Sequence, residues 1–371
     1  MSQSQELLHQ IALTLIDGVG DVLSKNLVAY CGSSEQVFKE KKSHLEKIPG
    51  IGSVVANKII ASQHVLQRAE EETEFINTNG ISALFFTDEK YPQRLKYCHD
   101  SPILVYYKGN ADLNNSKIVS VVGTRTPSEY GKQMTEKLIK DLSSSGVLIV
   151  SGLAYGIDVL AHKESLSNNL DTVGVLAHGL DRLYPAAHTN YAKKMIQQGG
   201  LLTEFMSETN PDRENFPKRN RIVAGMCDAL IVVESKRQGG SLITATIANA
   251  YNKDVFAFPG RADELLSEGC NGLIKSNKAN LIESAEDLFY IMNWNENIPK
   301  QKSTHQIPLF VDLNNEEQII VDCFKQKKQL HIDEICLVAK LPISKTSSCL
   351  LTLEFSNIIK SLPGKLYQLN C

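Results

Sequence analysis

Long apolar runs are missing from this sequence of 371 residues. No stretch approaches the roughly 18 consecutive apolar residues that cross a bilayer, and residues 1–6 lack the basic region of a signal peptide. We therefore expect a cytoplasmic protein that makes no membrane contact. The eight cysteines are scattered and include no Cys-x-x-Cys pair. This spacing is typical of reduced thiols and favours neither a zinc site nor a disulfide framework.

A strong charge of either sign is missing as well. Lys and Arg number 39 against 42 Asp and Glu, a formal net charge of −3. Any surface that binds a polyanion must therefore be a local patch. Apolar residues make up 42% and charged residues 22%, which excludes the composition of a disordered chain. The length predicts two or three globular domains.

The pattern of apolar residues and turn residues divides the chain into segments. The first segment contains short helices that are broken by glycines at 17–20 and 48–52, and it ends in an acidic run at 70–74. The second alternates short β-rich runs with longer helical ones, which is the rhythm of a parallel sheet with an α/β, Rossmann-like fold. We predict a helical domain over 1–80, a sheet domain over 81–295, a linker over 296–308 and a small domain over 309–371. The strands predicted in the sheet domain are 118–122, 147–150, 173–176, 201–203, 230–233 and 255–258.

Several loops of the sheet domain have a composition suited to phosphate. In an open parallel sheet, ligands bind beyond the carboxyl ends of the strands, where loops meet helix N-termini. Here Gly123-Thr124-Arg125 and Ser151-Gly152 each follow a predicted strand, and Gly239-Gly240-Ser241 precedes an apolar helix. The segment 216–221 adds Lys218, Arg219, Asn220 and Arg221. A single such loop is often a plain turn, but the group together predicts a shared anion site.

Recognisable catalytic and cofactor motifs are absent. The sequence contains neither the dinucleotide fingerprint G-x-G-x-x-G nor the P-loop, which disfavours a nicotinamide enzyme or an ATPase. His162, His178 and His188 belong to no metal-binding pattern, and we interpret them as structural histidines. Glu204 and Glu234 end two strands, where they are either paired carboxylates or residues that cap loops and neutralise nearby arginines. The residues predict no reaction, no metal and no cofactor.

The motifs of the sheet domain, in their order, closely resemble the DprA (Smf) family of DNA-processing proteins. The resemblance covers about 200 residues and rests on Val121-Val122-Gly123-Thr124-Arg125, Ser151-Gly152-Leu153-Ala154-Tyr155-Gly156-Ile157-Asp158, Gly179-Leu180-Asp181 with Tyr184-Pro185, Phe216-Pro217 with Arg219-Asn220-Arg221, and Gly240-Ser241-Leu242-Ile243-Thr244-Ala245. The resemblance implies a non-catalytic protein that binds single-stranded DNA without sequence preference. It also implies a homodimer that loads RecA recombinase onto DNA in natural transformation or recombination, with single-strand-binding protein as a candidate partner.

The resemblance also implies which residues contact DNA. Three positions depart from the family pattern: Tyr155 stands where many members have a basic residue, Gly239 replaces a usual serine, and Lys278 stands where a glycine is usual. Tyr155 can stack on a base but cannot pair with a phosphate, whereas Gly239 keeps the backbone N–H and loses a hydroxyl. The candidate DNA-binding residues are Gly123, Thr124, Arg125, Ser151, Gly152, Tyr155, Lys218, Arg219, Asn220, Arg221, Gly239, Gly240 and Ser241.

The flanking segments resemble small nucleic-acid-binding modules. The glycine turns at 17–20 and 48–52 resemble a tandem helix-hairpin-helix, although the segment is net acidic, which favours a structural or protein-contact role. The order helix, helix, hairpin after His331 is that of a winged helix, with Ser344 predicted to cap its second helix. That helix has one cation, Lys345, and three leucines, so a protein contact or a buried face is favoured over duplex recognition.

Two alternative functions, from other classes of protein, stay open. One is a nucleotide-cleaving phosphoribohydrolase of the cytokinin-activating (LOG) type, which has a similar sheet and a glycine-pair loop. The loop of that family carries an acid soon after the glycines, whereas residues 239–246 contain none. The other is a protein that senses a free nucleotide. Release of free base from nucleoside monophosphates, or mononucleotide binding as tight as oligonucleotide binding, would identify them.

Overall fold

The computed structural model describes residues 3–294 and 313–369, except 326, 328, 357 and 363. The predicted linker over 296–308 lies outside the described residues. The chain divides into two compact units, Met1–Ala285 and Glu286–Cys371. The finer domain boundaries predicted from the sequence stay a prediction.

The first unit begins with a group of short helices. Gly18 and Gly50 have φ values of +79° and +85°, and α2 and α5 begin directly after Gly20 and Gly52. Both predicted glycine breaks are therefore turns between helices. The buried residues of these helices share one apolar core with Phe85 of the neighbouring sheet. The helices are α1 (Gln3–Thr14), α2 (Asp21–Cys31), α3 (Ser34–Lys39), α4 (Lys42–Leu45), α5 (Ser53–Ala61), η1 (Ser62–His64) and α6 (Val65–Asn79).

The centre of the first unit is a nine-stranded sheet with the order β1-β2-β6-β5-β4-β3-β7-β8-β9. The pairs from β6 to β9 in this order are parallel, and β1 and β2 add an antiparallel edge. The six predicted strands are present. The sheet also contains β1, β2 and β9, which were not predicted from the sequence. The strands are β1 (Ser82–Phe85), β2 (Leu104–Gly109), β3 (Ile118–Val122), β4 (Leu148–Ser151), β5 (Thr172–Val175), β6 (Gly199–Thr203), β7 (Ala229–Val232), β8 (Asp254–Ala257) and β9 (Asn280–Leu281).

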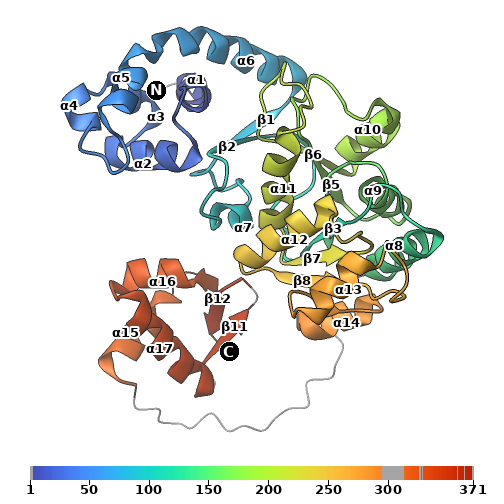
Figure 1. Ribbon diagram of the computed structural model, residues 1–371. Coiled ribbons are helices and arrows are strands. Elements are labelled where there is room, and N and C mark those ends of the chain that lie inside the picture. The colour runs from blue at the N-terminus through green and yellow to red at the C-terminus, as the bar shows by residue number, and fades with distance from the viewer. Residues whose placement is uncertain are drawn as a thin grey trace. The chain divides into compact units, whose positions relative to one another are not determined.

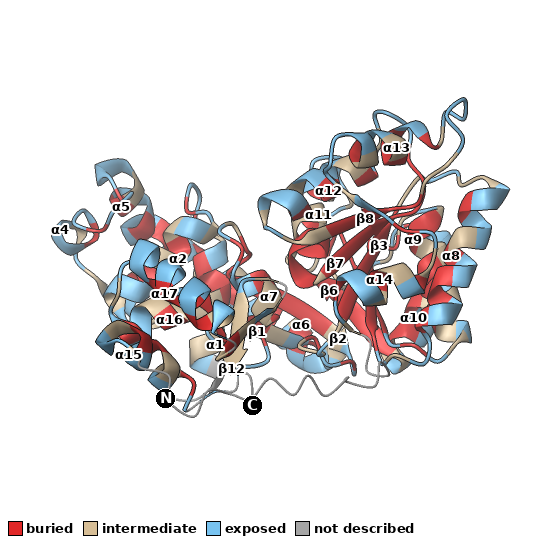
Figure 2. Cartoon of the chain, turned by 90° about the horizontal axis from the view of Figure 1, so that it is seen from below, coloured by how far each residue is buried: buried red, intermediate tan, exposed pale blue. Residues whose placement is uncertain are grey.

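Helices cover both faces of this sheet, as Figures 1 and 2 show. The strands β3, β4, β5 and β7 are buried along their whole length, which is why their sequences are nearly continuous apolar runs. The predicted α/β, Rossmann-like fold is confirmed. The helices are α7 (Gln93–Lys96), α8 (Glu129–Leu142), α9 (Ile157–Ser167), η2 (Ala186–His188), α10 (Thr189–Gln197), α11 (Asn215–Met226), α12 (Gly240–Ala250) and α13 (Glu268–Lys275). The next helix, α14 (Ala285–Ile291), begins at the last residue of the first unit.

The strand order reverses at β3. From β3 the chain proceeds through β4, β5 and β6 on one side, and then returns to place β7, β8 and β9 on the other. The loops that follow β3 and β7 therefore diverge at the carboxyl edge and leave a crevice between them. In open α/β sheets this switch point is where ligands bind.

The second unit contains most of α14 and, from residue 313 on, has the order helix, strand, two helices and hairpin. Its antiparallel sheet has the order β10-β12-β11, and Ile320, Ile335 and Leu353 are in its core. This arrangement confirms the predicted winged helix. The prediction that Ser344 caps the second helix is wrong: α17 begins at Ile343 and its N-cap is Pro342. The elements are α15 (Asn315–Cys323), β10 (Gln329–His331), α16 (Ile332–Ala339), α17 (Ile343–Phe355), β11 (Ile359–Leu362) and β12 (Leu366–Leu369).

No single helix in the described ranges is both long and apolar enough to cross a membrane. The pair α16 and α17 reaches that length and composition only when taken together, across a bend of 109°.

Candidate functional site

A cleft of about 320 Å³ lies at the carboxyl edge of the sheet, at the switch point. Loops after β3, β4 and β7 and the first half of α11 form its walls. The cleft brings together most of the residues predicted from the sequence, namely Gly123, Thr124, Arg125, Gly152, Arg219, Asn220, Gly239, Gly240 and Ser241.

A buried carboxylate fixes the loop after β3. The Glu234 carboxylate accepts hydrogen bonds from the Ser128 backbone N–H at 2.9 Å and from its hydroxyl at 2.5 Å. The Glu234 carbonyl accepts a further bond from the Thr124 N–H at 2.8 Å. Ser128 is the N-cap of α8, so the negative charge lies at the positive end of that helix dipole. Glu234 therefore orients the loop that carries Arg125.

A glycine joins the loops after β3 and β4. Gly156 has a φ of +82° and is the N-cap of α9. A Cβ on Gly156 would lie 2.2 Å from the Thr124 carbonyl oxygen. The next residue, Ile157, donates its N–H to that same oxygen at 3.1 Å. Only glycine permits this contact, because the conformation and the space both exclude a side chain.

Arg219 forms the floor of the cleft and is 4% exposed. Its guanidinium donates to the carbonyl oxygens of Gly152 and, at 2.6 Å, of Val175. Its Nε is buried and has no hydrogen-bond partner in the described part of the chain. Asp158 lies close by: burial raises its pKa, and the charge of Arg219 opposes that rise. Arg219 is thus a buried cation beneath the cleft.

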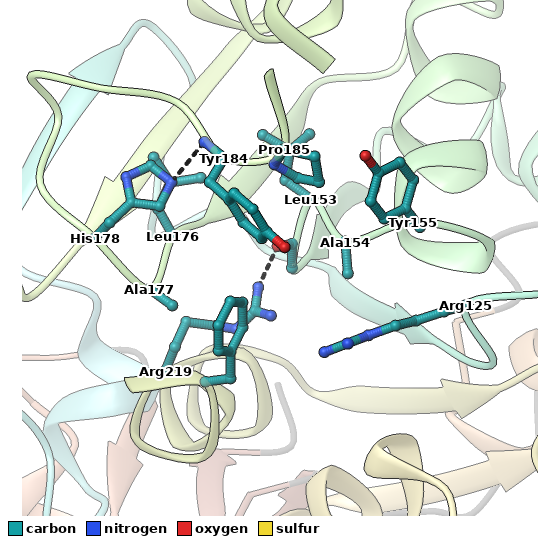
Figure 3. A pocket seen from close by; sticks show the side chains of 12 residues that line it. Arg125, Leu153, Ala154, Tyr155, Leu176, Ala177, His178, Tyr184, Pro185 and Arg219 are labelled. Atoms are coloured by element: carbon teal, nitrogen blue, oxygen red, sulfur yellow. Dashed lines mark hydrogen bonds between the residues drawn. The ribbon is translucent and has the colours of Figure 1, made fainter. Parts of the chain in front are cut away.

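Arg125 is an exposed cation of the cleft, as is Lys236. Its Cζ lies 5.7 Å from the centroid of the Phe216 ring, a cation–π distance. Figure 3 shows its side chain extending from the loop below Ala154 and Tyr155 toward Arg219. It forms no ion pair within the described ranges, so the guanidinium is available to an anion.

Aromatic side chains surround a small pocket beside the cleft, seen in Figure 3. Tyr184 meets Phe216 edge to face at 6.1 Å between ring centroids, and Tyr155 meets His188 in the same way at 5.0 Å. Tyr155 and Tyr184 are each 49% exposed, so both rings have a free surface. Exposed rings of this kind can stack on nucleobases, which all have a π-face.

The glycine loop after β7 brings a helix N-terminus to the cleft. Gly239 is the N-cap of α12 and has no side chain that could accept a hydrogen bond from the first turn. Backbone N–H groups of that turn are therefore open to a ligand. The Ser241 hydroxyl donates to the Ser235 hydroxyl at 2.9 Å, which holds the start of the helix. Lys236 and Gln238 line the cleft beside it.

Three predicted residues lie outside the cleft and its aromatic pocket. Ser151 is buried and donates its hydroxyl to the Val121 carbonyl oxygen at 2.6 Å. Lys218 is exposed on α11 but does not line the cleft. Arg221 points to the other side of the same helix. Tyr155, also predicted, lines the aromatic pocket and not the cleft itself.

Arg221 ties the N-terminal helices to the sheet. Its guanidinium pairs with Glu204 and, at 3.2 Å, with Asp21 at the start of α2, and it donates to the Asp100 carbonyl oxygen at 2.6 Å. Asp21 also accepts the Ile103 N–H at 2.9 Å. Burial raises the pKa of Glu204 to about 7, although Arg221 opposes this. Arg221 is thus occupied in a buried network.

The carboxylates and histidines singled out in the sequence are structural. Glu204 and Glu234 have separate partners, which confirms the interpretation that they neutralise cations and cap loops. His178 contacts the Gly179 carbonyl at 2.8 Å and the Tyr184 N–H at 3.1 Å, and His188 contacts the Leu153 carbonyl at 2.9 Å. Burial lowers the pKa of His162 to about 3, so its ring is neutral. The described residues contain no group of three or more potential metal ligands.

Several residues of the site were not predicted from the sequence. Tyr184 and Phe216 stand in motifs that carry the family resemblance, and their aromatic character was the available signal. Lys236 and Gln238 gave no signal, because an exposed polar residue in a loop is ordinary. The assembled site offers an exposed arginine over a buried one, open N–H groups and aromatic rings. That combination is suited to a phosphate backbone whose bases are unstacked.

Comparison with known proteins identifies a family and several relatives of this chain. The family model described as "DNA recombination-mediator protein A" matches residues 82–293, and "DprA winged helix domain" matches residues 311–365. Protein Smf of Synechocystis is 31% identical over 98% of this chain and 99% of its own length. The DNA processing protein DprA of Streptococcus pneumoniae is 41% identical over 54% of this chain and 71% of its own length.

Two solved structures are similar. The X-ray structure of DNA processing protein A from Streptococcus pneumoniae has a TM-score of 0.65 and 31% identity, and covers 78% of this chain and 98% of that chain. A structure of DNA processing protein A from Helicobacter pylori, described by its single-stranded DNA binding mode, has a TM-score of 0.52 and 29% identity. It covers 57% of this chain and 95% of that chain.

Proposed function

Because the chain belongs to the DprA (Smf) family of DNA-processing proteins, we propose that it binds single-stranded DNA without sequence preference in transformation or homologous recombination. The observation that carries this proposal is the cleft at the switch point, where Arg125 and the N-terminus of α12 face a site bordered by aromatic rings. The single-stranded DNA binding mode for which the Helicobacter pylori relative is described supports it.

The mode of binding follows from the site. A phosphate in the cleft would accept hydrogen bonds from Arg125 and from backbone N–H groups at the start of α12, above the positive charge of Arg219. A neighbouring base would stack on Phe216 or Tyr184. Such stacking requires an unpaired base, which favours single strands over duplex, and it tolerates every base.

The protein is proposed to act without catalysis. Asp158 lines the cleft but is buried beside Arg219, and Glu234 is held by Ser128. Neither carboxylate is placed as an exposed general base. Incubation with nucleoside monophosphates should release no free base, and turnover at an enzyme-like rate would favour a phosphoribohydrolase. A nucleotide-sensing protein would bind mononucleotides as tightly as oligonucleotides.

The downstream role that we propose is the loading of RecA onto DNA, by a homodimer in the cytoplasm. A dimer would have one cleft on each subunit. Binding of a DNA strand in one cleft would raise the effective concentration of DNA at the other and produce cooperative binding. The dimer would then hold a strand while RecA nucleates in the presence of single-strand-binding protein. This part of the proposal rests on family membership and not on residues of the cleft.

RecA-dependent ATP hydrolysis on DNA coated with single-strand-binding protein tests this role. Addition of the chain should shorten the lag before hydrolysis by the cognate RecA, and Arg125→Ala should lengthen it again. If the wild-type chain binds the DNA and leaves the lag unchanged, the mediator role is rejected and strand binding alone remains.

A further inference from the structure

A second concave surface lies between α9 and α10, outside the cleft. It has a volume of about 650 Å³ and is lined by Lys163, Leu166, Tyr191, Lys194, Gln197 and Gln198, and we refer to it as the α9–α10 groove. The two helices pack side by side and connect successive strands on the same face of the sheet, as Figures 1 and 2 show.

The α9–α10 groove is positively charged. No acidic side chain lines it in the part of the chain that the structure describes. Lys194 is exposed and forms no ion pair within the described ranges, and its neighbour Lys193 is exposed as well. Lys163 pairs with the adjacent Glu164 at 3.3 Å and is still 48% exposed. The groove thus has a local excess of cations on a chain whose net charge is −3.

The groove and the candidate DNA site share α9: Asp158 in the first turn of this helix lines the cleft, and Lys163 lines the groove. α9 begins at Ile157 after its N-cap Gly156, next to the cleft loops. Tyr155, which precedes Gly156, contacts the ring of His188, the N-cap of α10. Tyr191 then follows on the first turn of α10. From Ile157 to Lys163 the helix advances about 9 Å at 1.5 Å per residue. A stacked strand covers that length with about three nucleotides, at roughly 3.4 Å each.

We propose that the α9–α10 groove holds the segment of single-stranded DNA that leaves the cleft. The inference rests on the proposed function and adds a second contact to it. Lys163 and Lys194 would pair with phosphates, and Tyr191 would offer a ring to a base. Neither kind of contact reads sequence. An acidic peptide would satisfy the lysines but would make no use of Tyr191 or of the helix that the groove shares with the cleft.

The test compares oligonucleotides that can and cannot reach the groove. The double variant Lys163→Glu, Lys194→Glu is titrated as the full chain with oligothymidines of about four and about twenty nucleotides. The short oligonucleotide should bind the variant and the wild type within about twofold. The long one should bind the variant about tenfold more weakly, and the slope of log affinity against log salt should fall in magnitude by about 1.4.

A matched control separates a local contact from a change of net charge. Lys137→Glu with Lys140→Glu introduces the same charge on exposed residues of α8 that do not line the groove. This control should leave both affinities near wild type, and an equal loss in it would overturn the proposal. So would an unchanged long-oligonucleotide affinity in the groove variant.

Two further outcomes are distinguishable. A wild-type chain that fails to bind even the short oligonucleotide would reject the proposed function itself. Polyglutamate of about twenty residues should not compete with the long oligonucleotide. Competition that the groove variant abolishes would assign the groove to an acidic protein partner and overturn its assignment to DNA.

Discussion

Replacement of Arg221 by alanine distinguishes a DNA contact from a structural one. The sequence groups Arg221 with Arg219 and Asn220 as a DNA-binding residue, whereas the structure engages it with Glu204, Asp21 and the Asp100 carbonyl. Arg125→Ala provides the comparison, because Arg125 is exposed and lines the cleft. The two variants should differ in stability and in the salt dependence of binding.

The expected loss of stability follows from burial. The side chains of Arg221 and Glu204 are each 13% exposed. Removal of one partner from a buried ion pair costs about 3 to 5 kcal/mol. Glu204 can relieve part of this by taking up a proton, since burial already raises its pKa to about 7. We therefore expect a loss of about 3 kcal/mol in Arg221→Ala, which lowers Tm by about 5 °C.

The assay is a titration with oligothymidine at several salt concentrations, well below the Tm of each variant. Arg125→Ala should weaken binding for all sequences alike, and the slope of log affinity against log salt should fall in magnitude by about 0.7. Arg221→Ala should keep the wild-type slope. A folded Arg221→Ala protein with wild-type Tm and a slope reduced by about 0.7 would refute the structural assignment.

Asp21→Asn supplies an independent control. It removes a negative charge and loosens the hold on Arg221. If Arg221 contacted DNA, the variant would bind more tightly than wild type. We expect instead a lower Tm, unchanged or weaker binding, and faster hydrogen exchange at the Ile103 amide, which donates to Asp21.

Three further predictions concern the aromatic pocket, a buried histidine and the second unit. Phe216→Ala should cost about 1 to 3 kcal/mol of single-strand affinity through lost stacking with an unchanged salt slope, and a changed slope in the titration would contradict stacking. Burial lowers the pKa of His162 from 6.5 to about 3, so the unfolded chain binds more protons between these values and stability is lost as pH falls from 6.5 toward 3. In His162→Asn, the free energy of unfolding measured in urea should fall less steeply as pH decreases, by about 1 kcal/mol per pH unit over this window. The same pH dependence in the variant and the wild type would reject His162 as the cause. A chain that ends at Trp294 should stay folded and keep most of its affinity, and a loss above about tenfold, or ~1.4 kcal/mol, would show that the second unit holds part of the site.

The strands of the sheet domain could be predicted because burial on both faces leaves a clear trace in the sequence. Runs such as 118–122 and 230–233 are short, β-branched and followed at once by polar or glycine residues. The antiparallel strands β1 and β2 left a weaker trace. They join the sheet at an edge, and β2 pairs with a strand nearly a hundred residues away.

The roles of neighbouring polar residues could not be predicted. Arg219 and Arg221 are two residues apart on α11, which separates their side chains by about 200° around the helix axis. One therefore faces the cleft and the other the N-terminal helices. In the sequence both residues have the same chemistry. Their roles differ because Arg219 lies against the sheet and lines the cleft, whereas Arg221 reaches Asp21 at the start of α2. The same holds for Ser151, which the strand directs into the core, and Gly152, which lines the cleft.

The central claim is that the cleft binds single strands through phosphates and unstacked bases. The direct test is a titration of the full chain with single-stranded and duplex oligonucleotides of equal length at two salt concentrations. We predict clearly tighter binding to the single strand at both concentrations, a marked weakening at higher salt, and loss of the preference in Arg125→Ala combined with Phe216→Ala. Equal affinity for duplex and single strand, or a preference that survives the double variant, would contradict the account.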